Sequence, residues 1–453
     1  MSVEITNPWT GQVDYRYDYV DQAKVEQVLA KSRAAFGPWS ALSLEQRAEF
    51  LERIASQLRE HRERIAGIMS AEMGKLKREA LGEIEKCAGA CEYYARNAAK
   101  YLRDQPVPTE ATRSYVSYEP IGCVFAVMPW NFPIWQVFRF LAPALMAGNV
   151  ALLKHATNVP RCADVIAEML ERAGLPDGVF GVLHIDNEMA AKVIADPRVQ
   201  AVTLTGSERA GRSVAATAGR NLKKCVLELG GSDPFVVLDD ADLDKTIPMA
   251  ISSRFGNAGQ TCIAAKRFIV TPGIADEFVR RFVEAAGKLQ VGDPNDPATT
   301  LAPMVRPDLR DELHGQVQSS IAAGAKPLIG CVPGQGASHY PASILDDVAP
   351  GMVAYSEELF GPVASIIRVK DDADAVRVAN DTSFGLGASV WSEDKARGEA
   401  VARQISAGAC FVNAIVRSDV RLPFGGTKAS GFGRELAEHG IHEFMNIKTI
   451  YVD

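Results

Sequence analysis

The chain has 453 residues, of which 47% are hydrophobic and 23% charged, and its formal net charge is −7. This length allows two or three domains, and the composition is typical of a folded globular protein. The negative charge and the lack of a Lys/Arg-rich run argue against a nucleic-acid partner.

The cysteines and the apolar runs narrow the class of protein further. The eight cysteines form no CxxC pair and no Cys/His cluster at metal-ligand spacing, so we expect free thiols and no metal site. The longest apolar run, FLAPALMAGNVALL, is too short to cross a bilayer, and the N-terminus lacks the basic and apolar regions of a secretory signal. These features predict a cytoplasmic protein without a membrane partner.

The first 120 residues are predicted to be mainly helical. Ser43 and Gln46 have capping-box spacing at the start of a helical pattern that ends at Gly74, which predicts one long amphipathic helix. A second helical pattern runs to about Tyr101. Residues 102–120 are interrupted by prolines and then alternate, which is typical of an edge hairpin or arm.

From residue 121 the pattern alternates between short strands and helices. The strand runs are GCVFAVMPW, VALLKH, GVFGVLHI, AVTLTG and CVLELGG, and helical patterns cover 135–146, 158–173, 189–195 and 209–218. After residue 231 a second alternation includes PFVVL, RFIVT, ASIIRV and GASVW. The sequence therefore predicts an α/β protein with two doubly wound domains.

Ligands of doubly wound sheets bind at the carboxyl ends of the strands. There is no GxGxxG and no Walker P-loop, but LTGSERAG places Gly206 and Ser207 between a strand and a helix whose N-terminus could hold a phosphate. A plain strand-to-helix turn explains that spacing equally well. Lys154, at the end of VALLKH, could reach a ribose or phosphate, or it could be a solvated lysine.

Three further residues have side chains suited to catalysis. Glu228 ends a strand among apolar residues, where burial would raise its pKa toward that of a useful general base; helix capping or pairing with an arginine is the alternative. Asn131 offers an amide donor for an oxyanion, or it caps a helix with Pro133 in its first turn. Cys262, after Gly-Gln-Thr, is a nucleophile or a buried packing residue.

Together these stretches resemble the aldehyde dehydrogenase family. MPWNFP, LLKHA, LTGS, LELGG, GQTC, EELFGP and PFGGTKASGFGRE occur in the family's order, and PWNFPIWQVFRFLAPALMAGN and GQTCIAAKRFIV look most like its succinate-semialdehyde dehydrogenase branch. The resemblance implies that the Cys262 thiolate attacks an aldehyde and that Asn131 and the Cys262 N–H hold the oxyanion. Glu228 would then activate the water that hydrolyses the thioester.

The resemblance also implies a nicotinamide cofactor. It assigns Lys154 to the adenosine ribose, Ser207 beside Gly206 to the pyrophosphate, and Glu358 to the nicotinamide ribose. Trp130 and Phe360 would complete the cofactor site, and Phe424 would line the substrate wall.

Position 157 predicts which cofactor is used. Many NAD-preferring members of the family have a glutamate three residues after the Lys154 position, whereas this chain has Thr157. A threonine does not repel the 2′-phosphate and can donate a hydrogen bond to it. We therefore expect NADP to be favoured over NAD, with NAD still usable; the alternative is that Thr157 merely begins the next helix.

The substrate is predicted to bear a carboxylate. Trp135 and Arg139, spaced i, i+4, project from one helix face, and a guanidinium can grip a carboxylate with two hydrogen bonds. Ser418, with Arg417 or Arg421, would face them from the opposite wall. Succinate semialdehyde fits best and glutarate semialdehyde next; alternatively, Arg139 pairs with an acidic residue at a subunit contact.

The family fold implies a domain division and an assembly. Residues 1–101 and 121–230 would bind the cofactor, 231–435 would form the catalytic domain, and 102–120 with 436–453 would form an oligomerisation arm. Because a terminal strand without a local neighbour is an exposed edge that a partner subunit can cover, we expect a homodimer or homotetramer.

Other activities fit these residues less well. A cysteine hydrolase would need a histidine partner, and no histidine stands in a comparable motif. Members of the superfamily that pass the thioester to coenzyme A or phosphate are expected to lack the base at position 228. An inactive dinucleotide-binding or structural protein would not need Cys262, Glu228 and Asn131 together.

Overall fold

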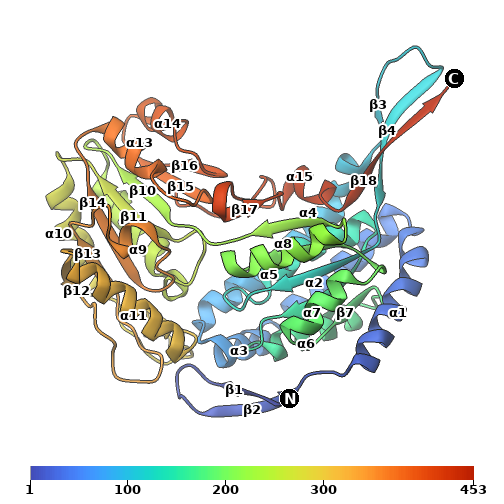
Figure 1. Ribbon diagram of the computed structural model, residues 1–453, viewed down its shortest axis with the longest axis horizontal. Coiled ribbons are helices and arrows are strands. Elements are labelled where there is room, and N and C mark those ends of the chain that lie inside the picture. The colour runs from blue at the N-terminus through green and yellow to red at the C-terminus, as the bar shows by residue number, and fades with distance from the viewer. Residues whose placement is uncertain (1) are drawn as a thin grey trace.

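The computed structural model describes residues 2–453, which form two α/β units, an N-terminal hairpin and a projecting arm (Figure 1). The hairpin pairs β1 (Ser2–Thr6) with β2 (Val13–Asp18). The two doubly wound α/β units confirm the predicted fold class. The predicted domain boundaries stay a prediction.

The first unit is built on a six-stranded sheet in the order β17-β9-β8-β5-β6-β7. Its strands are β5 (Cys123–Met128), β6 (Val150–His155), β7 (Phe180–Val182), β8 (Val199–Thr205), β9 (Lys224–Glu228) and β17 (Gly431–Phe432). Strands β5 to β9 are parallel and match the five predicted runs, whereas β17 pairs antiparallel with β9. Residues 431–432 thus join the first sheet, although the predicted division placed them with the second.

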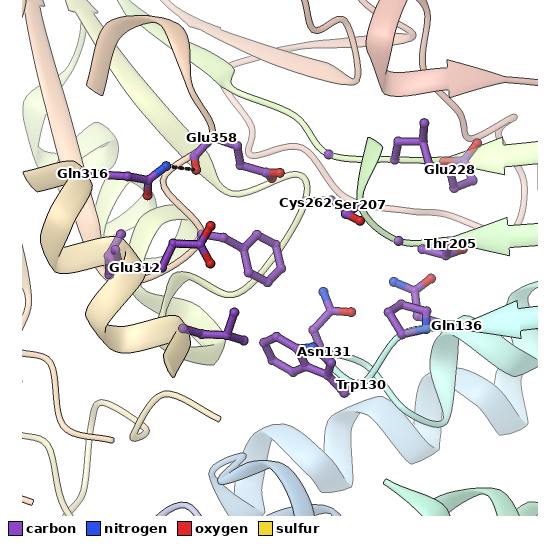
Figure 2. A pocket seen from close by; sticks show the side chains of 17 residues that line it. Trp130, Asn131, Gln136, Thr205, Ser207, Glu228, Cys262, Glu312, Gln316 and Glu358 are labelled. Atoms are coloured by element: carbon purple, nitrogen blue, oxygen red, sulfur yellow. Dashed lines mark hydrogen bonds between the residues drawn. The ribbon is translucent and has the colours of Figure 1, made fainter. Parts of the chain in front are cut away.

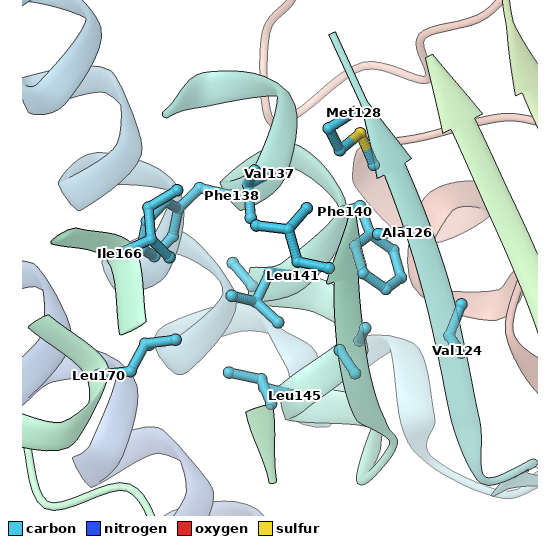
Figure 3. Close-up of a cluster of buried hydrophobic side chains, with 14 of the residues drawn as sticks. Val124, Ala126, Met128, Val137, Phe138, Phe140, Leu141, Leu145, Ile166 and Leu170 are labelled. Carbon is cyan, nitrogen blue, oxygen red and sulfur yellow. The ribbon is translucent and has the colours of Figure 1, made fainter. Parts of the chain in front are cut away.

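Helices cover both faces of this sheet and also form a layer beside it. They are α1 (Gln22–Ser40), α2 (Leu44–Glu60), α3 (Arg62–Met73), α4 (Lys77–Leu102), α5 (Trp135–Ala147), α6 (Pro160–Arg172), α7 (Asn187–Ala195) and α8 (Glu208–Arg220). All 13 residues of α5 are buried, including the polar Gln136 and Arg139 in an otherwise apolar helix. Figure 3 shows its side chains packed between β5 and α6.

The long helix predicted from Ser43 to Gly74 is two helices. The capping box of Ser43 and Gln46 and the left-handed Gly74 (φ 76°) are present as expected. However, His61 leaves the helical conformation (φ −100°, ψ 11°) between α2 and α3. The bend allows both helices to bury side chains in the same core as α4. Because this packing involves other segments of the chain, the periodicity of residues 43–74 does not predict the bend.

The second unit has a seven-stranded sheet in the order β12-β13-β14-β11-β10-β15-β16, in which only β12 is antiparallel among the described residues. The strands are β10 (Asp233–Val237), β11 (Ala265–Val270), β12 (Lys326–Ile329), β13 (Ser343–Asp346), β14 (Val363–Arg368), β15 (Gly387–Trp391) and β16 (Ala409–Val412). The helical segments are α9 (Leu243–Phe255), η1 (Gly256–Gly259), α10 (Ala275–Ala286), α11 (Pro307–Ala322), α12 (Val353–Ser356), α13 (Asp372–Asn380), α14 (Lys395–Ala402) and η2 (Lys428–Ser430).

The arm consists of β3 (Gln105–Pro106), β4 (Arg113–Pro120) and the C-terminal β18 (Met445–Val452), which follows α15 (Ala437–His442). Strand β4 lies between the other two, so the C-terminal strand joins the predicted hairpin. Figure 1 shows the arm projecting from the body of the molecule with the C-terminus near its tip. None of the helices in residues 2–453 is long and apolar enough to span a membrane.

Candidate active site

A cavity of about 320 Å³ lies where the carboxyl ends of β8 and β9 face the second unit (Figure 2). The first unit contributes the segments after β5, β8 and β9, and the second contributes Cys262, α11 and the segment after α12. The cavity brings together most of the predicted catalytic and cofactor residues, namely Trp130, Asn131, Gly206, Ser207, Glu228, Cys262, Glu358 and Phe360.

The turn before Cys262 has an unusual backbone. Asn257 (φ 53°) and Ala258 (φ 54°) are both left-handed, a conformation that costs free energy for residues other than glycine. The Asn257 Nδ2 donates to the Asn131 carbonyl oxygen (2.9 Å), and the Asn257 N–H donates to Glu79 Oε1 (3.1 Å). Tertiary contacts thus hold this turn in place and set the position of Cys262 relative to Asn131.

The surroundings of Cys262 favour the protonated form of its thiol. Burial raises its pKa to about 11, although the charges of Arg139 and Lys266 oppose the shift. Because the thiolate is the nucleophile, the thiol needs a base or a change in its surroundings before it can react.

The side chain of Asn131 is buried and fixed beside Cys262. One N–H of its amide donates to the Gln260 carbonyl oxygen (3.0 Å), which leaves the second N–H for an oxygen bound in the cavity. The alternative that Asn131 caps a helix is wrong, because α5 begins at Trp135 after an Ile134 cap.

The N-terminus of α5 is capped instead by a carboxylate from α4. Glu83 Oε1 accepts from the N–H groups of Ile134 (2.9 Å) and Trp135 (2.8 Å). Glu83 also forms a buried ion pair with Lys75, whose Nζ donates to the Asn131 carbonyl oxygen (2.9 Å). Pro133 therefore precedes the helix and does not form part of its first turn.

Glu228 has the burial predicted for it at the end of β9. Neither carboxylate oxygen has a hydrogen-bond partner within residues 2–453, and burial raises the pKa of Glu228 well above its usual range. Arg139 opposes this rise and Glu435 adds to it. A Cβ at position 425 would lie 2.7 Å from Glu228 Oε1, so Gly425 leaves room for the carboxylate.

Glu358 lines the opposite side of the cavity. Its Oε1 accepts from the Gly231 N–H (3.1 Å) and pairs with Lys266 Nζ (3.1 Å), and Lys266 also donates to the Cys262 carbonyl oxygen (2.6 Å). A Cβ at position 230 would collide with Glu358 Oε2, so a side chain there would displace this carboxylate. The ring of Phe360 stands edge-on to Trp130, with centroids 5.8 Å apart, and the two rings form an apolar wall.

The residues predicted to bind a dinucleotide suit its phosphates. Ser207 caps α8, whose first amides offer an anion site. The buried Lys154 is the next-to-last residue of β6 and has no carboxylate within 4.0 Å in the described chain, and burial lowers its pKa. Thr157 lies exposed in the following turn, and its carbonyl oxygen accepts from the Tyr17 hydroxyl (3.0 Å). Because α6 begins at Pro160, Thr157 does not start that helix.

The residues predicted to bind a substrate carboxylate lie outside the cavity lining. Arg139 forms a buried ion pair with Glu435, donates to Thr205 Oγ1 (3.1 Å) and stands over the Phe424 ring at 4.7 Å. Arg139 thus pairs with an acidic residue, but within its own chain and not at a subunit contact. Its role toward a substrate carboxylate stays a prediction.

The other residues of the predicted carboxylate site are also engaged. Ser418 accepts a hydrogen bond from Lys86 Nζ (2.6 Å), whose ammonium lies 4.2 Å from the Trp135 ring centroid. Arg421 is exposed and pairs with Asp419 (2.6 Å).

Several residues of the site were missed by sequence reasoning. Glu435 lies in the motif PFGGTKASGFGRE, and Lys266 lies four residues after Cys262. Both residues therefore lie in or near motifs that the sequence analysis used, but their spacing does not show which group they contact. Lys75, Glu83 and Gln260 support Asn131 from three separate segments. No local pattern identifies a buried pair of this kind.

Residues 1–450 match the model of the aldehyde dehydrogenase family. The chain is 47% identical to a probable NADP(+) succinate-semialdehyde dehydrogenase of Synechocystis over 100% of both proteins. It is 45% identical to an NAD(P)+ succinate semialdehyde dehydrogenase of Escherichia coli, covering 99% of this chain and 97% of that one. Among solved structures, it is similar to the Streptococcus pyogenes succinic semialdehyde dehydrogenase in complex with NADP+ (TM-score 0.97, 38% identity, 99% of both chains).

Proposed function

Because the chain belongs to the aldehyde dehydrogenase family, we propose that it oxidises succinate semialdehyde to succinate with NADP as the favoured cofactor. The observation that carries the reaction is the convergence of Cys262, Asn131 and Glu228 in one cavity. The substrate is supported by the names of full-length relatives that are 44–47% identical to this chain.

We assign the steps that follow deprotonation of the Cys262 thiol to residues of the cavity. The Cys262 thiolate attacks the aldehyde carbon, and the resulting thiohemiacetal oxyanion accepts hydrogen bonds from Asn131 Nδ2 and the Cys262 N–H. The nicotinamide of the bound cofactor would supply the acceptor for the hydride of this carbon. Glu228 then takes a proton from the water that attacks the thioester, which releases succinate and restores the Cys262 thiol.

The residues that would hold the cofactor lie on both units. The first amides of α8 after Ser207 would bind the pyrophosphate, and Lys154 would bind the adenosine ribose and its 2′-phosphate. Glu358 would accept from the hydroxyls of the nicotinamide ribose, while Trp130 and Phe360 form the apolar wall of the cavity.

We expect Thr157→Glu to lower the ratio of kcat/KM for NADP to that for NAD at least tenfold, which is about 1.4 kcal/mol. The substitution places a carboxylate three residues after Lys154, where it repels the 2′-phosphate and can accept from the ribose hydroxyls. Steady-state kinetics with both cofactors measures the ratio, and Thr157→Gln, which has nearly the same size without the charge, is the matched control. An unchanged ratio in the Thr157→Glu variant would show that the side chain at position 157 does not discriminate between NADP and NAD through the 2′-phosphate.

The substrate is tested with a panel of aldehydes and both cofactors. We expect kcat/KM for succinate semialdehyde to exceed the values for glutarate semialdehyde, butanal and propanal, followed by the absorbance of the reduced cofactor. Ester cleavage without any reduced cofactor would indicate a cysteine hydrolase. Tight dinucleotide binding without turnover of any aldehyde would indicate a binding protein, and turnover that requires coenzyme A or phosphate would indicate acyl transfer.

We also propose that the protein assembles as a homodimer or homotetramer through the arm. Strand β18 is an edge strand of eight residues, and it exposes Ile447, Tyr451 and Val452. A long exposed edge with apolar side chains is a surface that a partner strand can cover.

A further inference from the structure

The cavity between the two units has an uneven balance of charge for a site that binds a dinucleotide. Three carboxyl groups line it, those of Glu228, Glu312 and Glu358, but among the described residues no lysine, arginine or histidine does. The phosphates of the cofactor have their own donors in the first amides of α8 and in Lys154, which does not line the cavity. The carboxyl groups therefore face the nicotinamide end of the cofactor.

Two of these three carboxyl groups are compensated within the chain. Glu358 pairs with Lys266 Nζ (3.1 Å). Burial raises the pKa of Glu228 well above its usual range, which favours its neutral form. Glu312 differs from both, because it is exposed and, within residues 2–453, no lysine, arginine or histidine nitrogen lies within 4.0 Å of its carboxylate. Glu312 thus supplies the uncompensated negative charge of the lining.

Glu312 lies on the face of α11 that closes the cavity. Four residues at the i, i+3, i+4 and i+7 spacing of one helix face line it, namely Leu309, Glu312, Leu313 and Gln316. Gln316 Nε2 donates to the Glu358 carbonyl oxygen (3.4 Å), so this face lies against the segment assigned to the nicotinamide ribose. Figure 2 shows the Glu312 side chain extending from α11 into the cavity, on the same side as Glu358.

The oxidised and the reduced cofactor differ in charge at the ring that this cavity would hold. The nicotinamide ring carries one positive charge in NADP+ and none in NADPH, because the hydride adds a proton together with two electrons. A carboxylate near the ring attracts the charged form and lacks this attraction for the neutral one. The phosphates are the same in both forms, so their repulsion by Glu312 cancels when the two forms are compared.

We propose that Glu312 makes the cavity bind the oxidised cofactor in preference to the reduced one, an inference that rests on the proposed function. The attraction between Glu312 and the ring is present before hydride transfer and is lost after it. Glu312 is therefore a specificity residue for the redox state of the cofactor, and it favours release of the reduced form. Because the carboxylate is exposed, solvent and salt weaken the effect to a few-fold preference.

The test measures the dissociation constants of NADP+ and NADPH without aldehyde, for the wild-type protein and for Glu312→Gln. Calorimetry gives the Kd of NADP+, and the fluorescence of the reduced ring gives the Kd of NADPH. We expect the ratio of Kd for NADPH to Kd for NADP+ to fall by a factor of about 3 to 10 in Glu312→Gln, which keeps the size of the side chain without its charge. The difference between the two proteins should shrink in about 1 M salt, where charges are screened within about 3 Å.

Two further variants separate the charge at position 312 from other effects. Glu312→Asp keeps the charge and should retain most of the wild-type ratio. The matched control is Asp311→Asn, which removes an exposed carboxylate from the neighbouring position of α11 that does not line the cavity, and it should keep the wild-type ratio.

A ratio that does not fall in Glu312→Gln overturns this inference, even if both cofactors bind more tightly or more weakly than before. An equal fall in Asp311→Asn also overturns it, because the effect would then come from the net charge of the protein. Neither result affects the proposed function. Wild-type protein that binds neither dinucleotide overturns both.

Discussion

Cys262→Ala is expected to reduce aldehyde oxidation to the background rate, a loss of at least about 10⁴-fold in kcat. Without the thiol no thiohemiacetal forms, and no other cysteine lines the cavity within the described part of the chain. The absorbance of the reduced cofactor, followed with succinate semialdehyde, measures the loss. Cofactor binding should survive, because the residues assigned to the phosphates and riboses are unchanged.

Cys225→Ala is the matched control for this prediction. Cys225 is also partly exposed and lies on β9, only three residues before Glu228, but it does not line the cavity. It should retain activity close to that of the wild type. If the Cys262→Ala variant still oxidised the aldehyde, Cys262 would not be the nucleophile.

Glu228→Gln is expected to separate the two halves of the reaction. The first turnover should produce a burst of reduced cofactor, followed by a steady rate lower by about 10² to 10⁴, the usual contribution of a general base. The amide keeps the size of the side chain in its buried site but cannot take a proton from water.

Rapid mixing with a saturating aldehyde measures both phases of Glu228→Gln. A burst equal to the enzyme concentration would show that Cys262 and the bound cofactor still react, so the defect lies in hydrolysis of the thioester. A normal steady rate would contradict the assignment of Glu228 as the base. Loss of the burst would place the role of Glu228 before hydride transfer.

The surroundings of Glu228 explain how a carboxylate can serve as this base. Arg139 lies near both Glu228 and Glu435, but its ion pair is with Glu435. Burial raises the pKa of each carboxyl group, and one guanidinium cannot compensate both charges. Glu228 can therefore accept a proton more readily than an exposed glutamate would.

The sequence alone predicts the order of the elements and the principal residues of the site. The alternation of short apolar runs with helical periodicity predicts the parallel strands β5 to β9 and, in the second unit, β10, β11, β14 and β15, because a strand buried on both faces and an amphipathic helix have different patterns. Parallel strands end at one edge of the sheet, so ligand-binding residues were expected at the carboxyl ends of the strands. The structure brings Gly206, Ser207 and Glu228 together there.

Only the tertiary structure decided which distant groups became partners. The bend at His61, the return of β17 to the first sheet and the capping of α5 by Glu83 all depend on packing between segments far apart in the chain. Spacing in the sequence can place Arg139 on the same helix face as Trp135, but it cannot show that Glu435 neutralises that arginine. It likewise cannot show that Glu83 pairs with Lys75 while Lys86 donates to Ser418, since which carboxylate meets which cation depends on distances that exist only in the folded chain.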